Sequence, residues 1–352
     1  MSVSLSPSGV MICNFECEMP VCRESGLKTI TLMRKLCHIS FSSHEEVMFR
    51  CEEDINYAFN CFAVACLETD SRPLADSEMT THCHFGIITE NAQLAFTRFR
   101  YPYARYFNYK YGRRGRLGER TAFFLQVDGL QHSLSMLSYV FRQALHHGLS
   151  ESSFGYRHNS VNTIFQSKLG KIQNYDILGR SRMSKYLPCP QRELPDAYRM
   201  NRNGLLLRED VIDTSYVEEL FISPRSFLYY MNRVSSDAWK EEQMTDNNGL
   251  PPITLDVIEP DCYRQAMPQL LQNETGRHFR NNITDLELCA LIDGYYLSRL
   301  NRRSIYELSD SERQALGNRI FSDFKSGRIS AMLGRNAGLP SIAQIKRCAV
   351  IL

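Results

Sequence analysis

The chain has 352 residues, which is longer than most single domains and favours two compact units. Apolar residues make up 43% and charged residues 23%, a balance that excludes the intrinsically disordered class. No apolar run approaches the roughly 18 residues of a membrane helix, and the N-terminus lacks the basic and apolar regions of a signal peptide. We therefore expect a cytoplasmic protein with no membrane segment.

The overall charge is close to balanced. A formal net charge of +2 argues against a polycation that coats nucleic acid. The 41 basic residues nevertheless comprise 32 Arg and 9 Lys. Arginine pairs bidentately with phosphate and stacks on bases, but a GC-rich genome produces the same skew, so the positions of the arginines decide its meaning.

The twelve cysteines include no C-x-x-C pair. Their spacing is irregular, which favours reduced cysteines in apolar positions, such as Cys61 and Cys66. The alternative is a tetrahedral zinc site. Its candidate ligands are Cys13, Cys17, Cys22, Cys37 and His38.

Residues 1–31 are aperiodic and are interpreted as a leader. Alternating and helical patterns then predict a compact unit over 32–168. Its elements are a strand over 32–42, a helix over 52–68, strands over 73–80 and 81–88, a helix over 92–111, a strand over 121–127 and a helix over 132–147. This order is typical of an α+β fold in which helices pack on a mostly antiparallel sheet.

The remainder of the chain is predicted to be different in character. Residues 169–262 alternate short apolar pieces with polar loops and form an irregular connecting region, with a linker over 247–261. Residues 263–352 return to helical periodicity and form a mainly helical appendage. Its last 25 residues have the outline of a helix-turn-helix reader of duplex DNA or, equally, of a packed helical hairpin. The candidate phosphate contacts there are Arg335, Lys346 and Arg347.

His82-Cys83-His84 lies in one of the predicted strands. Residues two apart on a strand share a face, so the two imidazoles converge while Cys83 points into the core. Two imidazoles on one face can begin a divalent-metal site. On its own the pattern is equally that of two structural histidines.

Tyr139 and Gln143 are four residues apart in the last predicted helix and therefore lie on one face. A tyrosine can attack a phosphodiester and form a covalent phosphotyrosine, and a glutamine carbonyl can complete the shell of a metal ion. The alternative is an ordinary half-buried tyrosine. His146 and His147 at the helix end can stabilise the helix dipole or contact a phosphate, or serve as spare ligands.

A basic and aromatic stretch separates these two motifs. Between residues 98 and 120 eight residues are basic and only Glu119 is acidic. Arginines bind backbone phosphates and aromatic rings stack on unpaired bases, which favours single-stranded nucleic acid. The basic residues are Arg98, Arg100, Arg105, Lys110, Arg113, Arg114, Arg116 and Arg120.

Over residues 32–165 the sequence resembles the single-tyrosine HUH transposases, which include the insertion-sequence-200-type and REP-associated tyrosine transposases. The resemblance rests on the stretches MFRCEEDINYAF, EMTTHCHFGI, YARYFNYKYGRRGRLGER and SYVFRQALHHGL, which contain the His-x-His and Tyr-x-x-x-Gln pairs. It differs at Thr80-Thr81, where relatives often have Pro-Asn, and at Gln143-Ala144, where the REP-associated group has Asn-Pro.

The resemblance implies a ferredoxin-like core that cleaves and rejoins single-stranded DNA near short hairpins through a 5′-phosphotyrosine. It implies that Tyr139 is the nucleophile and that His82, His84 and Gln143 hold Mg²⁺ or Mn²⁺. Arg113, Arg114 and Arg116 are implied to hold DNA. It also implies a bacterial, nucleoid-associated protein and leaves open whether the tyrosine acts within one subunit or across a homodimer.

Two other functions stay open at this point. One is a domesticated hairpin-binding protein that keeps the fold without the chemistry. The other is a replication or mobilisation initiator nuclease with the same site. Intact His82, His84, Tyr139 and Gln143 favour an enzyme over the silent protein.

Overall fold

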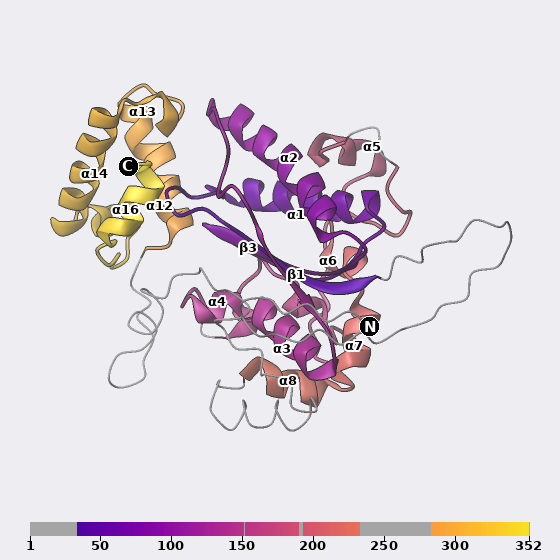
Figure 1. Ribbon diagram of the computed structural model, residues 1–352. Helices are drawn as coiled ribbons and strands as arrows, with labels where there is room; N and C mark the ends of the chain where they lie inside the picture. The colour runs from indigo at the N-terminus through magenta and orange to yellow at the C-terminus, as the bar shows by residue number, and fades with distance from the viewer. Residues whose placement is uncertain (1–33, 151, 190–192, 233–282, 352) are drawn as a thin grey trace, which may run out of the picture.

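The computed structural model describes residues 34–150, 152–189, 193–232 and 283–351 (Figure 1). The predicted leader over 1–31, the linker over 247–261 and three of the zinc candidates lie outside the described residues; those three are Cys13, Cys17 and Cys22. The fourth candidate cysteine, Cys37, is a free thiol in β1. Among the residues described, no helix is both long and apolar enough to span a membrane.

One antiparallel sheet of four strands organises the first unit, in the order β2-β3-β1-β4. Helices α1 and α2 cover one face of this sheet, and α3 and α4 lie on the other (Figure 1). The order of elements confirms the α+β prediction. The bounds are β1 Lys35–Ser42, α1 Glu52–Glu68, β2 Arg72–Met79, β3 His82–Thr89, α2 Ala92–Tyr111, β4 Phe123–Val127, α3 Leu130–Phe141 and α4 Gln143–His146.

The predicted single helix over 132–147 is wrong in one respect. The structure has two helices, α3 and α4, which are separated at Arg142. The backbone at Arg142 has φ −97° and ψ 6°, outside the helical range, so the regular 3.6-residue register ends there. Tyr139 and Gln143 therefore lie on either side of a break rather than on one uninterrupted helix face.

Helix α2 is defined by signals at both of its ends and by a ring contact with the sheet between them. Its N-terminus is capped by Asn91, whose side chain accepts a hydrogen bond from the backbone N–H of Leu94 at 2.9 Å. It ends at Gly112, whose φ of 63° is the left-handed conformation that glycine adopts without strain. Between the two ends, Phe99 packs edge-on against Phe85 of β3. This ring contact fixes α2 to the sheet face that it shares with α1.

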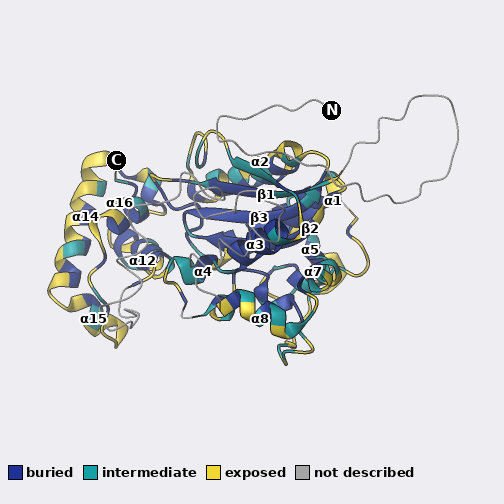
Figure 2. Ribbon diagram, turned by 60° about the horizontal axis from the view of Figure 1, so that its bottom comes forward, coloured by how far each residue is buried: buried dark blue, intermediate teal, exposed yellow. Residues whose placement is uncertain are grey.

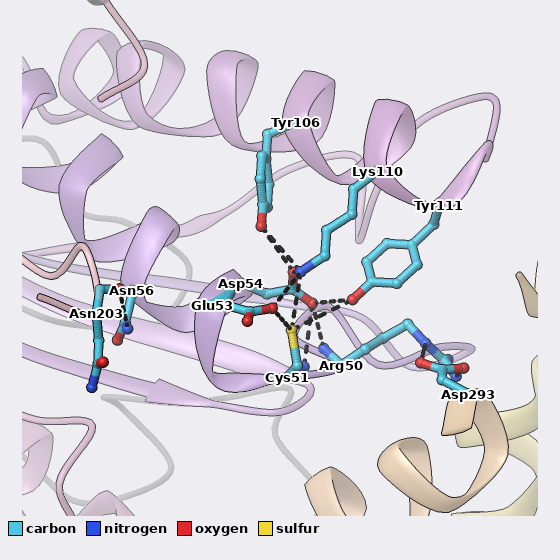
Figure 3. A network of polar contacts seen from close by, with 10 residues as sticks. All are labelled: Arg50, Cys51, Glu53, Asp54, Asn56, Tyr106, Lys110, Tyr111, Asn203 and Asp293. Atoms are coloured by element: carbon cyan, nitrogen blue, oxygen red, sulfur yellow. Dashed lines mark hydrogen bonds and ion pairs between the residues drawn. The ribbon is translucent and has the colours of Figure 1, made fainter. Parts of the chain in front are cut away.

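A buried carboxylate, Asp54, joins the N-terminus of α1 to the C-terminus of α2 (Figure 3). Its Oδ2 accepts hydrogen bonds from the Arg50 backbone N–H at 2.9 Å and from the Tyr111 hydroxyl at 2.8 Å. Its Oδ1 lies 2.7 Å from Lys110 Nζ. A negative charge at a helix N-terminus is favoured by the helix dipole, and Lys110 neutralises it.

Residues 153–232 continue the same core. The main apolar cluster runs from Leu36 to Met231, so the predicted boundary at residue 168 does not coincide with a break in packing. The predicted irregular region contains short helices, of which α7 and α8 pack beside α3. They are η1 Ser153–Gly155, η2 Val161–Thr163, α5 Arg180–Met183, η3 Ser184–Tyr186, α6 Arg208–Val211, α7 Thr214–Phe221 and α8 Pro224–Asn232.

Residues 283–351 form a helical unit whose buried residues face its interior (Figure 2). They make a second apolar cluster, which Val47 of the first unit joins. Arg50, fully buried, ties the helical unit to the first unit, because its guanidinium lies 2.7 Å from Asp293 and donates to the Cys348 carbonyl at 2.9 Å. The elements are α12 Asp285–Leu291, the π-helical turn η4 Ile292–Tyr296, α13 Leu297–Arg299, η5 Ile305–Glu307, α14 Asp310–Lys325, α15 Arg328–Leu333 and α16 Ile342–Ala349.

Arg208 is a buried cation that contacts two acidic side chains of β2. Its Nε donates to Asp76 at 2.7 Å and its second guanidinium nitrogen to Glu78 at 2.8 Å, and all three side chains are buried. Arg208→Met would leave Asp76 buried without a counter-charge. It would also remove the donor to Glu78, whose pKa is raised by burial and by Asp76. We expect it to lower the free energy of unfolding by about 3–5 kcal/mol, measured by urea denaturation. The exposed pair Arg202–Asp176 is the control, and Arg202→Ala should cost at most about 1 kcal/mol.

His158 makes the fold sensitive to acid. Burial, with repulsion from Arg208 and Arg157, lowers the pKa of this histidine to about 3. Its folded pKa lies below the unfolded value, so its contribution is complete above about pH 6.5 and is lost as the pH falls. His158→Gln should therefore reduce the stability lost between pH 7 and pH 5 by about 2 kcal/mol. Urea denaturation at both pH values measures this difference, and an equal loss in both proteins would contradict it.

Candidate active site

Three histidines meet on the sheet face that carries α3. His82 and His84 point from β3 to this face, as predicted, and Cys83 is buried on the other. His38 of β1 stands beside them, with its Nε2 3.0 Å from His84 Nδ1. The rings of His38 and His84 stack with centroids 5.3 Å apart. The predicted pair is therefore part of a larger imidazole cluster.

The sequence motifs predict His38 only as a zinc ligand, whereas the structure places it in this cluster. The sequence does carry a signal for it. Polar side chains alternate along β1 at His38, Ser40 and Ser42, and the residues between them are apolar. Since β1 pairs with β3, this polar face must join the one that holds His82 and His84.

Tyr139 of α3 covers the imidazole cluster from above the sheet. Its ring meets those of His84 and His38 edge-on, with centroids 5.5 Å and 5.9 Å away. Its hydroxyl is buried, and among the described residues it has no hydrogen-bond partner. Two of the predicted features, the histidine pair and the tyrosine, are therefore brought together by the fold.

The short helix α4 closes the site. Gln143 is buried, and its amide nitrogen donates to the Tyr139 carbonyl at 3.4 Å. Its side chain also lies close to His82 and raises the pKa of that histidine. Burial and repulsion from His147 lower the same pKa by more. His147 at the helix end has its Nε2 3.0 Å from His82 Nε2, and the His146 ring lies 5.6 Å from that of Tyr139.

Two imidazoles of β3, His82 and His84, and two at the end of α4, His146 and His147, have lowered pKa values that favour the neutral form. Burial, supported by repulsion from neighbouring imidazoles, lowers the pKa of His82 and His84 well below the ordinary value. Burial also lowers the pKa of His146 to about 3 and of His147 to about 4, the latter with repulsion from Arg347. A neutral imidazole has one nitrogen that can act as a metal ligand once its present partner is displaced.

The turn before β3 positions the first histidine. Thr81 Oγ1 lies 3.0 Å from His82 Nδ1, which orients the ring so that Nε2 faces His147. The preceding residue, Thr80, donates from its hydroxyl to Asp285 of α12 at 2.9 Å. Asp285 in turn accepts two hydrogen bonds from Arg347, at 2.8 Å and 2.9 Å. The helical C-terminal unit thus contacts the turn that carries His82.

The residues predicted to hold a metal ion include no acidic side chain and no thiol. Across residues 34–150, 152–189, 193–232 and 283–351, no three His, Cys, Asp or Glu side chains are arranged to hold a metal ion. The expected set of His82, His84 and Gln143 is of another kind, two imidazoles and an amide. These donors are neutral, and imidazole suits Mn²⁺ better than Mg²⁺, which prefers oxygen.

The basic stretch does not line this site, contrary to what its place in the sequence suggests. It lies on α2 and the following loop, and α2 packs on the opposite face of the sheet (Figure 1). Five of its eight basic residues have partners within the fold, including Arg116, whose Nε donates to the Gly118 carbonyl at 3.3 Å. The contacts of the other four are Arg98 with Glu68 at 3.8 Å, Arg100 with the carbonyls of Leu117, Glu119 and Arg120, Lys110 with Asp54, and Arg113 with Glu46.

The aromatic residues of the stretch divide in the same way. Phe99, Tyr103 and Phe107 are buried in the main core, whereas Tyr101 is 78% exposed and Tyr109 90% exposed. Arg105, Arg114, Arg116 and Arg120 have exposed side chains. The part of the stretch that can meet a ligand is therefore smaller than its sequence indicates.

Two of the three C-terminal candidates for phosphate contacts also have ion-pair partners within the fold. Arg335 forms an ion pair with Glu287, and Arg347 with Asp285, so both stabilise the helical unit in which they lie. Lys346 on α16 is exposed. Helices α15 and α16 are joined by a turn, as the sequence indicates, and α16 packs against α12 and α14.

The Tyr139 hydroxyl provides a test of this description. Because it is buried without a partner, Tyr139→Phe should leave the free energy of unfolding unchanged or raise it by up to about 1 kcal/mol. The matched control is Tyr111→Phe, which removes a 2.8 Å hydrogen bond to buried Asp54 and should cost about 1–3 kcal/mol. Urea denaturation measures both. A loss for Tyr139→Phe as large as the control would contradict the placement of this hydroxyl.

No family model matches the chain, and no curated protein matches it. A solved structure described as "Structure of the REP associates tyrosine transposase bound to a REP hairpin" is similar over 44% of this chain and 87% of that chain. The TM-score is 0.33 and the sequence identity 7%. This likeness is distant and leaves the family of the chain open, so the proposals that follow depend on the side chains described above.

Proposed function

We propose that the chain is a metal-dependent enzyme that cleaves and rejoins single-stranded DNA beside short hairpins, a transposase or endonuclease with Tyr139 as its nucleophile. The observation that carries this proposal is the buried Tyr139 hydroxyl, which has no hydrogen-bond partner among the described residues and lies over a cluster of neutral imidazoles. An unsatisfied buried hydroxyl costs stability, and such groups are retained where they have a function.

The topology supports the fold that this function requires. The elements follow the order β1-α1-β2-β3-α2-β4, and the sheet has the order β2-β3-β1-β4 with both helices on one face. We infer from this β-α-β-β-α-β order that the unit is ferredoxin-like, since that order is typical of such folds. In the proposal, the sheet face opposite α1 and α2 is the catalytic face.

The histidine pair is proposed to hold the divalent ion, together with Gln143. The donors fit a cation that accepts imidazole nitrogen, and we expect Mn²⁺ to serve better than Mg²⁺. His147 is a further candidate ligand because its Nε2 lies 3.0 Å from that of His82. When bound, the ion would neutralise charge on the scissile phosphate, whose own oxygens would supply the negative charge that this ligand set lacks.

The reaction assigned to Tyr139 is a transesterification. Its oxygen attacks the phosphorus, an O–P bond to the tyrosine forms, and the bond from phosphorus to the 3′-oxygen breaks. The tyrosine proton passes to water, and the departing 3′-oxygen takes up a proton from water. Attack by a 3′-hydroxyl on the phosphotyrosine reverses these steps and rejoins a strand.

Access to Tyr139 requires α4 to move. The tyrosine side chain is only 4% exposed, and the short α4 carries the residues that cover it. The break at Arg142 is the place where the backbone can change direction without unwinding α3. DNA that enters the site is therefore proposed to displace residues 143–147.

The same burial favours a second candidate function. A hairpin-binding protein that has lost the chemistry has no need to expose its tyrosine.

A replication or mobilisation initiator would share the site and differ in its target, so a preference for an origin sequence identifies it.

Covalent trapping tests the enzyme. The protein is incubated with Mn²⁺ or Mg²⁺ and labelled hairpin oligonucleotides drawn from the DNA that flanks its gene. We expect an adduct that survives denaturation and maps by mass spectrometry to the peptide containing Tyr139. Tyr139→Phe should abolish the adduct without weakening hairpin binding, whereas Tyr109→Phe, at an exposed position, should retain it.

Two outcomes would contradict this proposal. If the wild-type protein forms no adduct with any hairpin, the enzyme is excluded, and salt-sensitive hairpin binding without cleavage would then support the silent protein. If Tyr139→Phe still forms the adduct, another residue is the nucleophile.

A further inference from the structure

A pocket lies on the side of the molecule opposite Tyr139, between the outer surface of α2, the loop over 115–122 and the strand β4. Its volume is about 910 Å³. We call it the arginine pocket. Its lining includes Phe96, Arg100, Tyr101, Arg105, Arg116, Arg120 and Phe124.

Every charged residue that lines the arginine pocket is an arginine. Arg100, Arg105, Arg116 and Arg120 all contribute to it, and no carboxylate does. Like charges that converge on one cavity repel each other, and an anion bound there would relieve this repulsion. In keeping with this, burial and repulsion from Arg116 lower the pKa of Arg100.

The four arginines differ in how firmly other residues hold their side chains. Arg100 is held by hydrogen bonds to the carbonyls of Leu117, Glu119 and Arg120 and lies over the Phe41 ring at 4.9 Å. It therefore builds the wall of the pocket. The other three have exposed side chains, although Arg116 Nε donates to the Gly118 carbonyl at 3.3 Å. Their guanidinium groups can pair bidentately with a phosphate.

Aromatic rings occur on the same lining. Tyr101 is 78% exposed at the rim, although it occupies a helix whose other rings are largely buried. Phe96 and Phe124 lie at the floor, where their rings meet edge-on with centroids 5.8 Å apart. An exposed tyrosine beside arginines can stack on a flat base while the arginines take the phosphate next to it.

We propose that the arginine pocket binds one nucleotide, with its base against Tyr101 and its phosphate on Arg105, Arg116 and Arg120. The nucleotide can belong to a single strand or be free, since the recognised chemistry is the same. The proposal does not depend on cleavage at Tyr139, because the sheet separates the two sites.

Binding is measured with Tyr139→Phe protein, which prevents any cleavage. Two probes are titrated by calorimetry, a single-stranded (dT)10 oligonucleotide and the mononucleotide dTMP. We expect the double variant Arg105→Gln/Arg120→Gln to weaken the binding of (dT)10 at least tenfold, and Tyr101→Ala to weaken it about tenfold. Arg98→Gln and Tyr109→Ala, on the same helix but outside the lining, should each change it less than twofold.

The two probes distinguish the sources of the nucleotide. Saturable binding of dTMP that is lost in the double variant would show that a free nucleotide suffices, whereas binding of (dT)10 alone would assign the pocket to a strand. Unchanged affinity in both the double variant and Tyr101→Ala would overturn the proposal. Competition by inorganic phosphate as strong as that by dTMP would also overturn it, because the base would then contribute nothing. Urea denaturation confirms that each variant is folded.

Discussion

The fold depends on one buried carboxylate. Asp54 accepts hydrogen bonds at the first turn of α1 and from the last turn of α2, and its charge is neutralised by Lys110. A buried charge of this kind is stable only with all its partners, so the two helices are fixed to each other and to one face of the sheet. Arg50, whose backbone N–H contacts Asp54, sends its side chain to Asp293 and the Cys348 carbonyl. The segment from Arg50 to Asp54 therefore contacts the units that hold both apolar clusters. The histidines lie on the opposite face of the sheet.

Most of the sheet and its helices could be predicted from local periodicity. The bounds expected for α1 and α2 agree with those observed, because each has an apolar stripe and definite start or stop signals, acidic residues at 52–54 in one and Gly112 in the other. The placement of His82 and His84 on one face follows from the two-residue repeat of a strand, which needs no knowledge of the tertiary structure. The break at Arg142 has no such signal, since no Gly or Pro marks it.

What the sequence could not reveal is which distant groups meet. Lys110 and Arg113 resemble DNA-binding residues in a basic run, but their partners, Asp54 and Glu46, lie more than 50 residues away. Charge patterning along the chain cannot detect such pairs. His38 joins the imidazole cluster only through the pairing of β1 with β3. The same limit applies to the basic stretch, which lies between the His-x-His and Tyr-x-x-x-Gln motifs in sequence and on the opposite face of the sheet in space.

The turn at Thr80 has a consequence for how this chain can change over time. Asp285 and Arg347 hold that turn from the C-terminal unit, and the next residue, Thr81, orients the first histidine of the cluster. The carbonyls of Thr80 and Thr81 also accept backbone hydrogen bonds from Met48 and Ser43, so a C-terminal unit exchanged for another would remove only the contact to the Thr80 hydroxyl. A chimera that keeps this contact beside His82 must carry Thr80, Asp285 and Arg347 as a matched set.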